Sequence, residues 1–254
     1  MHRFFVTDRP LAMGAEVDLA PIARQLRQVL RMQPGDHILL LDNAGHAFDT
    51  EILLCTPRAV RGAIVAGQPA GGEPSAQLTL YPCSLKADRF EWMLQKGVEL
   101  GVARFVPVIS ERTIARPATA LLKRYPRWQA IVREAAEQCQ RGAIPSLDPP
   151  LALPDAVRAA TGQRLLPWEA SAGPGPAAAM AAQLEPAASI SLLIGPEGGL
   201  TYGEVTLAQE HGWTLVSLGA RILRAETAAL AATAIVMAQL GELGDVGTPT
   251  ARPF

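Results

Sequence analysis

The sequence predicts an α/β protein built on a mostly parallel sheet, and three observations support this class. Short apolar runs alternate with helical stretches from about residue 78 to residue 240. Strands that alternate with helices form parallel sheets with both faces covered. Two of the apolar runs end in sharp loops that open a helix, and 254 residues are enough for one large or two modest domains.

The first 66 residues predict a small β-rich unit. His37–Leu41 and Phe48–Leu54 are strand-like, and the turn residues Asp42–Gly45 between them indicate a hairpin. We expect one helix, over Pro21–Met32, to interrupt the strands. The Gly- and Pro-rich stretch Ala66–Pro74 predicts a linker, so a domain boundary is expected there.

After this linker the pattern predicts a regular alternation. The expected elements are strand Leu78–Cys83, helix Arg89–Leu100, strand Phe105–Ile109, helix Leu121–Gln140, strand Arg164–Pro167, an Ala-rich helical stretch, strand Ile190–Ile194, helix Tyr202–His211, strand Thr214–Leu218 and helix Glu226–Leu240. Thr201 and Glu204 have the spacing of a capping box, which fixes the start of the helix at Tyr202. A second Pro/Gly-rich stretch, Ala172–Pro176, is expected to be a surface loop.

Two loops in this part predict a small-molecule crevice. The first is Ile194–Thr201 and the second Leu218–Thr227, and we expect both at the carboxyl ends of neighbouring strands, where backbone N–H groups and helix N-termini point. Glycines at 195, 198 and 199 allow positive φ and a close approach of backbone to ligand. Neither loop has the Gly-Lys-Ser/Thr ending or the G-x-G-x-x-G spacing of a nucleotide-phosphate loop.

Composition narrows the class of protein further. No apolar run reaches the roughly 18–20 residues that span a bilayer, and the N-terminus lacks the pattern of a signal peptide. Cys55, Cys83 and Cys139 have no metal-binding spacing and are expected to be buried thiols in a reducing cytoplasm. We therefore expect a cytoplasmic protein without a membrane span or a metal.

Charge is unevenly distributed along the chain. The net charge is −1, which excludes a uniformly basic coat for nucleic acid. Residues 83–145 carry 11 Lys and Arg against 6 Asp and Glu, whereas residues 146–254 carry 5 against 10. A phosphate-binding surface would use residues 1–31 and 83–145, although charge also fluctuates along chains that bind no phosphate.

The two loops resemble the C-terminal half of the SPOUT class of RNA methyltransferases. More closely, nearly the whole chain is similar to the family that methylates N3 of a uridine in 16S ribosomal RNA. The matching segments are Met1–Val6, Val29–Arg31 with Gly35-Asp36, Glu91-Trp92, Gln95–Val102, Pro107, Ser110–Thr113 and Glu134–Arg141.

This resemblance implies an architecture that periodicity does not. It implies a PUA-like β-barrel over residues 1–70, which would bind RNA, and a SPOUT domain over residues 75–254 with a deep C-terminal trefoil knot. It also implies a homodimer, 16S rRNA or the small ribosomal subunit as partner, and S-adenosyl-L-methionine as cofactor. The small side chains of the last helix would suit a threaded segment, and they equally suit ordinary tight packing.

The resemblance also implies which residues bind the cofactor. They are Leu166, Pro167, Trp168, Ile194, Gly195, Pro196, Glu197, Gly198, Gly199, Leu218, Gly219, Arg221, Ile222 and Leu223. Two of these residues have alternative roles, because Glu197 could instead cap a helix and Trp168 could be a core residue.

The chemistry of the acceptor suggests the catalytic residues. Uridine N3 is an imide nitrogen that reacts as its anion, so the site needs a base or a cation that stabilises this anion. The candidates near the loops are Glu169, Glu197, Arg221, Arg224 and Glu226. We expect Arg224 to contact the target base or its phosphate and Glu169 to make a polar contact beside it, although Arg224 and Glu226 could also pair with each other.

Candidate RNA contacts lie in the two basic segments. Arg24, Arg27 and Arg31 have the spacing of one helical face, with Arg3 nearby in sequence. This stripe binds phosphates or is simply a solvated face. The residues that we expect to bind RNA are Arg3, Arg27, Arg31, Lys86 and Arg141.

The leading hypothesis is therefore an rRNA (uridine-N3) methyltransferase. Two alternatives stay open: a ribose 2′-O-methyltransferase of the same class, and a non-catalytic RNA-binding or assembly factor that kept the fold. The N-terminal match disfavours the first, and the intact glycine loops disfavour the second.

Overall fold

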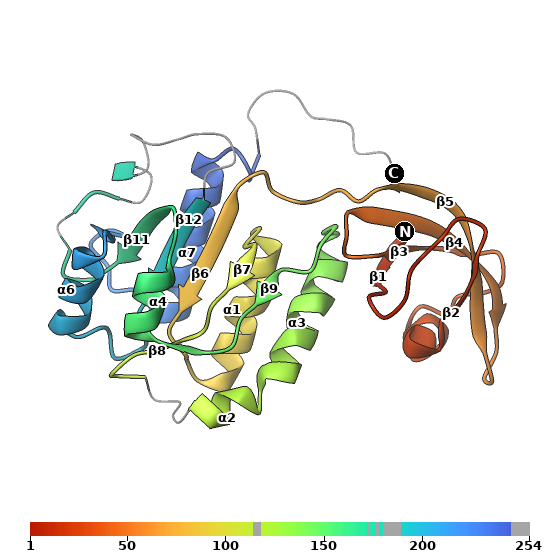
Figure 1. Cartoon of the computed structure of the whole chain (residues 1–254), viewed down its shortest axis with the longest axis horizontal. Helices are drawn as coiled ribbons and strands as arrows, with labels where there is room; N and C mark the ends of the chain where they lie inside the picture. Colours follow the sequence, from red (N-terminus) through yellow and green to blue (C-terminus); the bar gives the residue numbers. More distant parts are fainter. Residues whose placement is uncertain (114–117, 172, 176–177, 180–188, 245–254) are drawn as a thin grey trace. The chain divides into compact units, whose positions relative to one another are not determined.

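The structure is a computed structural model that describes residues 1–113, 118–171, 173–175, 178–179 and 189–244. It divides into two compact units (Figure 1). The first consists of Met1–Glu73 with Ala136–Ile144, and the second of Pro74–Ala135 with Pro145–Phe254.

The first unit is a five-stranded sheet in the order β1-β3-β4-β5-β2. Its strands are β1 (His2–Phe5), β2 (Glu16–Asp18), β3 (His37–Leu41), β4 (His46–Cys55) and β5 (Val60–Pro69). The predicted hairpin is confirmed, because β3 and β4 pair antiparallel around a turn in which Asn43 and Gly45 have positive φ. Two register shifts in the pairing of β4 with β5 bend this sheet. The linker prediction is wrong in part, because its first residues continue β5 as far as Pro69.

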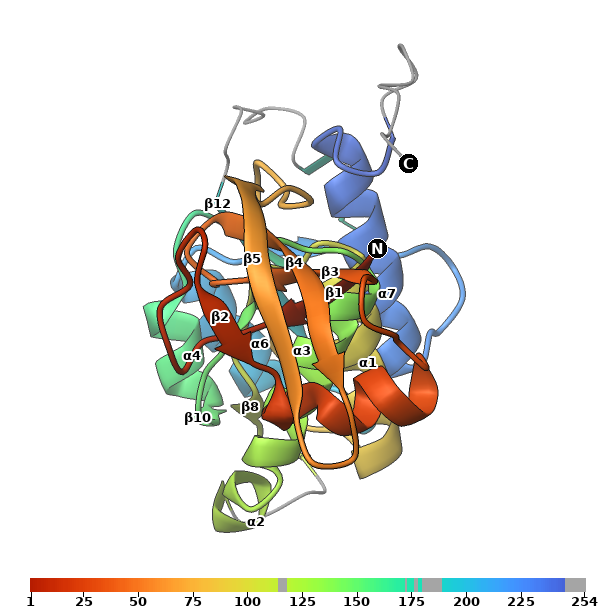
Figure 2. The same cartoon turned by 90° about the vertical axis from the view of Figure 1, so that its right-hand side faces the viewer.

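The helix predicted over residues 21–32 is present in a shorter and irregular form over residues 20–29 (Figure 2). A 3₁₀ turn covers Ala20–Ile22, and a π-helix covers Gln25–Val29, in which the Leu30 N–H donates to the Gln25 carbonyl at 2.9 Å. Arg31 lies after this helix at φ 54°. The single arginine stripe is therefore wrong: an i→i+5 turn changes the helical spacing, and Arg31 is outside the helix.

A distant segment, residues 136–144, completes the first unit. The Phe5 N–H donates to Glu137 Oε1 at 2.9 Å, and Arg3 Nη1 donates to the Gln140 carbonyl at 2.8 Å. Arg141 is only 4% exposed and forms an ion pair with Glu73 at 2.6 Å. The same Glu73 carboxylate accepts the N–H groups of residues 142 and 143. These bonds explain why this segment belongs with residues 1–73.

The second unit is built on a six-stranded sheet whose strands pair in parallel, in the order β13-β11-β12-β6-β7-β9 (Figure 1). The strands are β6 (Gln77–Pro82), β7 (Arg104–Phe105), β9 (Ser146–Leu147), β11 (Gln163–Pro167), β12 (Ser189–Ile194) and β13 (Thr214–Val216). A separate two-stranded pair consists of β8 (Val108–Ile109) and β10 (Leu151–Ala152). The expected α/β class with a mostly parallel sheet is confirmed.

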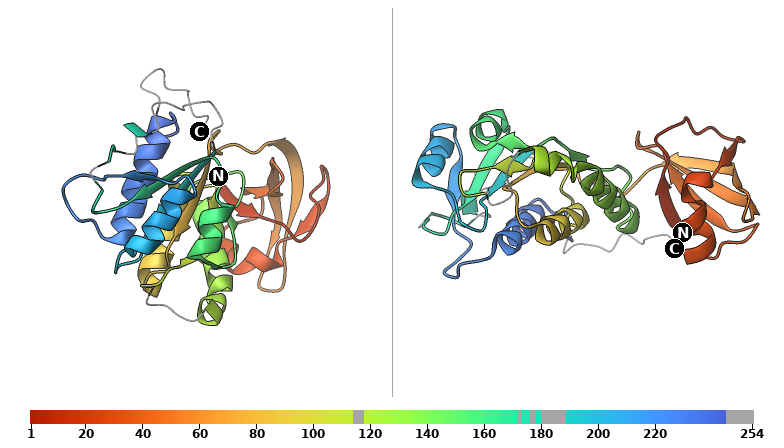
Figure 3. Two further views of the ribbon diagram at one scale, coloured as in Figure 1. Left: turned by 60° about the vertical axis from the view of Figure 1, so that its left-hand side comes forward. Right: turned by 90° about the horizontal axis from the view of Figure 1, so that it is seen from below.

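Helices cover both faces of this sheet (Figure 3). On one face, α1 (Ala87–Glu99) packs against α7 (Ala225–Gln239); on the other, α4 (Leu153–Ala159) packs against α6 (Tyr202–Glu210). The remaining described helices are α2 (Ala118–Leu122) and α3 (Tyr125–Gln138).

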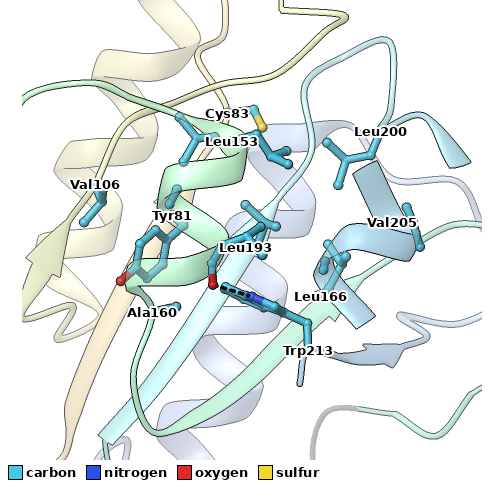
Figure 4. Close-up of a cluster of buried hydrophobic side chains, with 14 residues drawn as sticks. Tyr81, Cys83, Val106, Leu153, Ala160, Leu166, Leu193, Leu200, Val205 and Trp213 are labelled. Carbon is cyan, nitrogen blue, oxygen red and sulfur yellow. Dashed lines mark hydrogen bonds between the residues drawn. The ribbon is translucent and has the colours of Figure 1, made fainter. Parts of the chain in front are cut away.

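Alternation along the strands divides the core between the two faces. Tyr81 pairs with Leu193, and both belong to the buried cluster under α4 and α6 (Figure 4). In this cluster the Trp213 ring packs edge-on against the Tyr81 ring, with 5.9 Å between the ring centroids. Trp213 also donates its Nε1–H to the Val157 carbonyl at 3.3 Å. Adjacent residues on these strands, such as Leu192, are also fully buried, which is why the strands have continuous apolar sequences.

After residue 74, three predicted elements differ from the structure, two of them because of proline. The strand expected over 105–109 is two short strands in different sheets, since Pro107 has no N–H to continue a ladder. The helix expected over 121–140 is α2 followed by α3, which begins at Tyr125 with Pro126 in its first turn, where proline is tolerated. The strand expected to end at residue 218 ends at Val216.

Two other predictions concern residues that the structure does not fully describe. Much of the Ala-rich stretch and part of the 172–176 loop lie outside the described residues. Conversely, β9, β10 and α4 were not predicted from the sequence, because all three are short.

Candidate active site

Three loops lie at one edge of the parallel sheet, not two. The expectation that the two glycine loops follow neighbouring strands is wrong, because β11 lies between β12 and β13. The end of β11, Pro167–Glu169, is therefore placed between the other two loops. Carboxyl ends of parallel strands are the usual position of ligand crevices in such sheets.

The three loops surround a cavity with a volume of about 300 Å³. Its lining residues are Arg89, Pro167, Trp168, Glu169, Ile194, Gly195, Pro196, Glu197, Gly199, Leu200, Ile222, Leu223, Arg224, Ala225 and Ala228. A smaller cavity of about 70 Å³ shares six of these residues and adds Ser217, Leu218, Gly219 and Arg221. The structure thus brings together most residues that were predicted to bind the cofactor.

The loop after β12 has a conformation fixed by its own hydrogen bonds. The Gly199 N–H donates to the Pro196 carbonyl at 2.9 Å, and Gly199 has φ 68°, in the left-handed region. The predicted capping box is present: Thr201 Oγ1 accepts from the Glu204 N–H, and the Glu204 carboxylate accepts from the Thr201 N–H. The loop therefore ends at a defined helix start, with its backbone facing the cavity.

Gly198 packs against Arg112. It is absent from the cavity lining, and a Cβ on Gly198 would lie 3.3 Å from Arg112 Cβ. Arg112 Nη1 donates to the Gly198 carbonyl at 3.0 Å. Gly198 thus gives room to a supporting arginine, while Gly199 and Gly195 line the cavity.

Glu197 both caps a helix and faces the cavity. Its Oε1 accepts from the Lys86 N–H at 3.3 Å. Lys86 lies directly before α1, so the helix that Glu197 caps is α1 and not α6, the helix that follows the loop. Its Oε2 is buried and has no hydrogen-bond partner within the described structure. This oxygen is available to a donor from a ligand.

Trp168 is both a core residue and a cavity residue. It packs against the buried cluster under α6, and its ring lies edge-on to the Tyr202 ring, with 5.4 Å between the ring centroids. Leu166 is fully buried in β11 and supports this position from within the core. Leu166 therefore acts behind the cavity wall.

The loop after β13 is open toward solvent. Gly219 has φ 96° with no atom within 4 Å of a Cβ built on it, and Ile222 is 87% exposed. The Gly219 N–H donates to Ser217 Oγ at 3.2 Å, which shapes the turn. Ile222 therefore exposes an apolar side chain at the cavity.

Arg224 and Glu226 do not form the pair that was considered from the sequence. Arg224 is exposed at the N-cap of α7 and lines the cavity. Glu226 is buried and lies 3.6 Å from Arg89 Nε of α1. Arg89 was missed as a cavity residue, although its position at the start of a helix after β6 is the signal that could have identified it.

The predicted RNA contacts fall into two groups. Lys86 and Arg31 are exposed, and Arg3 and Arg27 are half-buried. Arg141 must be removed from the set, because its guanidinium is buried against Glu73.

The thiols also differ from expectation: Cys83 is buried, and burial raises its pKa to about 12, but Cys55 and Cys139 are partly exposed.

The described residues contain neither a membrane span nor a metal cluster. Across them, no helix is long and apolar enough to cross a membrane. The same residues contain no group of three or more His, Cys, Asp or Glu side chains that could hold a metal ion.

Comparison with known proteins defines the class of this chain. Residues 72–237 match the RNA methyltransferase domain, so the α/β unit with its three-loop cavity is that of an RNA methyltransferase. Ribosomal RNA small subunit methyltransferase E of Synechocystis is 35% identical over 218 residues, covering 85% of this chain and 70% of the relative. The chain belongs to the ribosomal RNA small subunit methyltransferase E family.

Solved structures agree with this placement. A ribosomal RNA small subunit methyltransferase E from Neisseria gonorrhoeae, bound to S-adenosylmethionine, has a TM-score of 0.83 at 35% identity and covers 94% of this chain and 97% of its own. A Legionella pneumophila protein in complex with the same cofactor has a TM-score of 0.84 at 30% identity, with coverage of 93% and 96%.

Proposed function

We propose that this enzyme transfers a methyl group from S-adenosylmethionine to N3 of a specific uridine in 16S rRNA. The observation that carries the proposal is the cavity of about 300 Å³ at the sheet edge, lined by residues of three loops that include both acidic and basic ones. The relatives named above support the cofactor and the RNA. We place the enzyme in the cytoplasm, where ribosomal RNA is its substrate.

The residues present fit this cofactor. Two carboxylates suit the positive groups of a sulfonium amino acid: that of Glu169, and that of Glu197, whose buried Oε2 has no hydrogen-bond partner among the described residues. The positive φ of Gly199 and the open space at Gly219 leave backbone accessible to an adenosine. The residues that would hold it are those predicted, without Gly198 and Leu166, which support the walls.

The side chains of this enzyme prepare the acceptor base for methyl transfer. When bound, the cofactor supplies a methyl group that is already activated, so no metal is required. Arg224 would stabilise the negative charge that forms on the uracil ring when N3 loses its proton, and Glu169 would orient the base from the opposite loop. The cavity walls would align the two reactants.

Nucleoside analysis tests the proposed function. We expect 16S rRNA from a strain lacking this gene to lack one N3-methyluridine, and complementation to restore it, measured by mass spectrometry. A change in a ribose methyl group instead would identify a 2′-O-methyltransferase. No change in any methylated nucleoside would support the non-catalytic alternative.

We also propose the finer architecture. The C-terminal segment would form a trefoil knot under the loops, within a SPOUT domain over residues 75–254. Residues 1–70 would form a PUA-like RNA-binding domain, which the bent strands β4 and β5 support.

RNA binding should depend on basic residues of the first unit. We expect Arg27→Glu with Arg31→Glu to weaken RNA binding and to flatten its salt dependence. The slope of the logarithm of the binding constant against the logarithm of the salt concentration should become shallower by roughly 0.7–0.9 for each phosphate that is no longer neutralised. Cofactor affinity should stay unchanged, because the cavity residues all lie in the second unit. Filter binding at several salt concentrations measures this, and Arg58→Glu with Arg61→Glu, two exposed arginines of the first unit, is the control of equal charge. Equal effects of both pairs would contradict a specific RNA surface.

We propose a homodimer formed mainly by residues after about 75. The exposed apolar side chains of Ile222 (87%), Trp92 (46%) and Ile235 (37%) support a covered surface in this unit. Light scattering should give twice the chain mass of 27.0 kDa at micromolar concentration. A stable monomer would contradict the proposal.

A further inference from the structure

A partly buried ion pair between Arg89 and Glu226 lies beside the cavity, and Arg89 belongs to a helix outside the three loops. Arg89, in the first turn of α1, lines the cavity, and its Nε lies 3.6 Å from Glu226 Oε1. Glu226 is in the first turn of α7, so the pair joins two helices that pack side by side. The Arg89 side chain is 34% exposed, whereas the Glu226 side chain is 12% exposed.

Burial makes Glu226 a fixed support for Arg89. Residue Glu226 is only 9% exposed, and its Oε2 is buried without a hydrogen-bond partner in the described structure. A carboxylate in this position needs a cation, and the described residues offer it Arg89. The Arg89 Nε contacts Glu226 as an ion pair at 3.6 Å, and no hydrogen bond to the two terminal nitrogens of Arg89 is found among the described residues. These nitrogens form the fork that binds planar or anionic oxygen groups.

Charge complementarity assigns this fork to the methyl acceptor. The charged groups around the larger cavity are Arg89, Arg224, Glu169 and Glu197, with Lys86 at the start of α1 and Glu226 beneath Arg89. The guanidinium groups of Arg89 and Arg224 attract an anion, such as the uracil ring when N3 has lost its proton, whereas the two carboxylates attract the positive groups of the cofactor. The smaller cavity, lined by the loop after β13, contains Arg221 but neither Arg89 nor Arg224.

We propose that Arg89, oriented by Glu226, is a second cation of the acceptor site and stabilises the negative charge on the uracil ring as N3 loses its proton. This inference rests on the proposed function and deepens it. Arg89 is then a catalytic residue that contacts the target base, and Glu226 is a positioning residue. The proton leaves N3 first and passes to solvent or to a carboxylate of the cavity; the N3 electron pair would then take the methyl group, and the electron pair of the broken S–CH₃ bond would stay on sulfur.

The test is the pH profile of methyl transfer by Arg89→Lys. Lysine keeps the charge beside Glu226 but loses the fork, so the protein should fold. We expect kcat to fall at least tenfold at pH 7, with the dissociation constant for S-adenosylmethionine within twofold of the unmodified enzyme. Because weaker stabilisation of the anion raises the pKa of the target N3–H, the alkaline rise of kcat should move up by about one pH unit for a tenfold loss. The substrate is small ribosomal subunits from the deletion strain.

Two further variants test the pair itself. Glu226→Gln keeps the shape of the side chain, and its profile should shift in the same direction by a smaller amount. Arg89→Gln with Glu226→Gln removes both charges together, so no buried charge is left uncompensated, and this variant should lose at least as much activity as Arg89→Lys. Arg158→Lys, in an exposed pair with Asp155 on α4, is the matched control and should behave as the unmodified enzyme.

The outcomes separate this inference from the proposed function. If the unmodified enzyme forms no N3-methyluridine, the proposed function fails. If it does and Arg89→Lys loses activity equally at every pH, Arg89 is structural and the inference is wrong. A tenfold weaker cofactor affinity with an unchanged profile would assign Arg89 to the cofactor instead. A normal profile for Glu226→Gln would show that Glu226 does not orient Arg89.

Discussion

Replacing Arg224 with alanine is expected to lower the rate of methyl transfer about 100-fold while leaving both ligands bound. Arg224 lines the cavity, is exposed, and its side chain makes no hydrogen bond in the described structure, so its removal should not disturb the fold. A single donor that stabilises developing negative charge in a preorganised site is worth roughly 10²–10³ in kcat. The loss should therefore appear in kcat.

Single-turnover kinetics with isolated small subunits measures this effect, and calorimetric titration checks cofactor binding. Arg224→Lys should recover part of the rate, since it restores the charge without the planar fork. Arg158→Ala, on the exposed surface of α4, controls for the loss of any surface arginine. If Arg224→Ala methylates at the normal rate, Arg224 is structural and the anion is stabilised elsewhere.

The second large effect is expected at Gly199 and concerns cofactor binding. Gly199 lines the cavity at φ 68°, and a Cβ added there would lie 2.9 Å from Glu169 Oε1. A left-handed conformation costs roughly 1–2 kcal/mol for a residue with a Cβ. The added methyl would also displace a carboxylate that we expect to face the cofactor. We therefore expect Gly199→Ala to weaken binding of S-adenosylmethionine at least tenfold, starting from a micromolar dissociation constant, or about −8 kcal/mol.

Isothermal titration calorimetry of Gly199→Ala and Gly203→Ala compares the same added methyl group at two neighbouring positions. Gly203 lies in the first turn of α6, where a Cβ meets no atom within 4 Å, so the affinity of this variant should stay within twofold of the unmodified enzyme. Gly199→Val should abolish measurable binding. If Gly199→Ala and Gly203→Ala both bind the cofactor with the affinity of the unmodified enzyme, this loop is not part of the cofactor site.

Much of the second unit was determined by local sequence. The capping box at Thr201 and Glu204 was predicted correctly because each of its hydrogen bonds joins residues three apart. The strands β6, β11 and β12 were predicted because strands that are covered on both faces need continuous apolar runs. The glycine loops were also recognisable, because each one directly follows such a run.

Only the tertiary structure decided which of these pieces are neighbours. Strand order placed β11 between the two glycine loops, and helix packing brought Arg89 of α1 beside Glu226 of α7. The fold likewise buried Arg141 against Glu73, although a sequence rich in basic residues favoured an exposed phosphate contact. Local patterns report hydrogen bonds and burial within a few residues, whereas pairing across 68 residues, as between Glu73 and Arg141, depends on how whole elements pack. A side chain's partner therefore cannot be read from its charge alone, because the fold determines which opposite charge it meets and how much water remains around it.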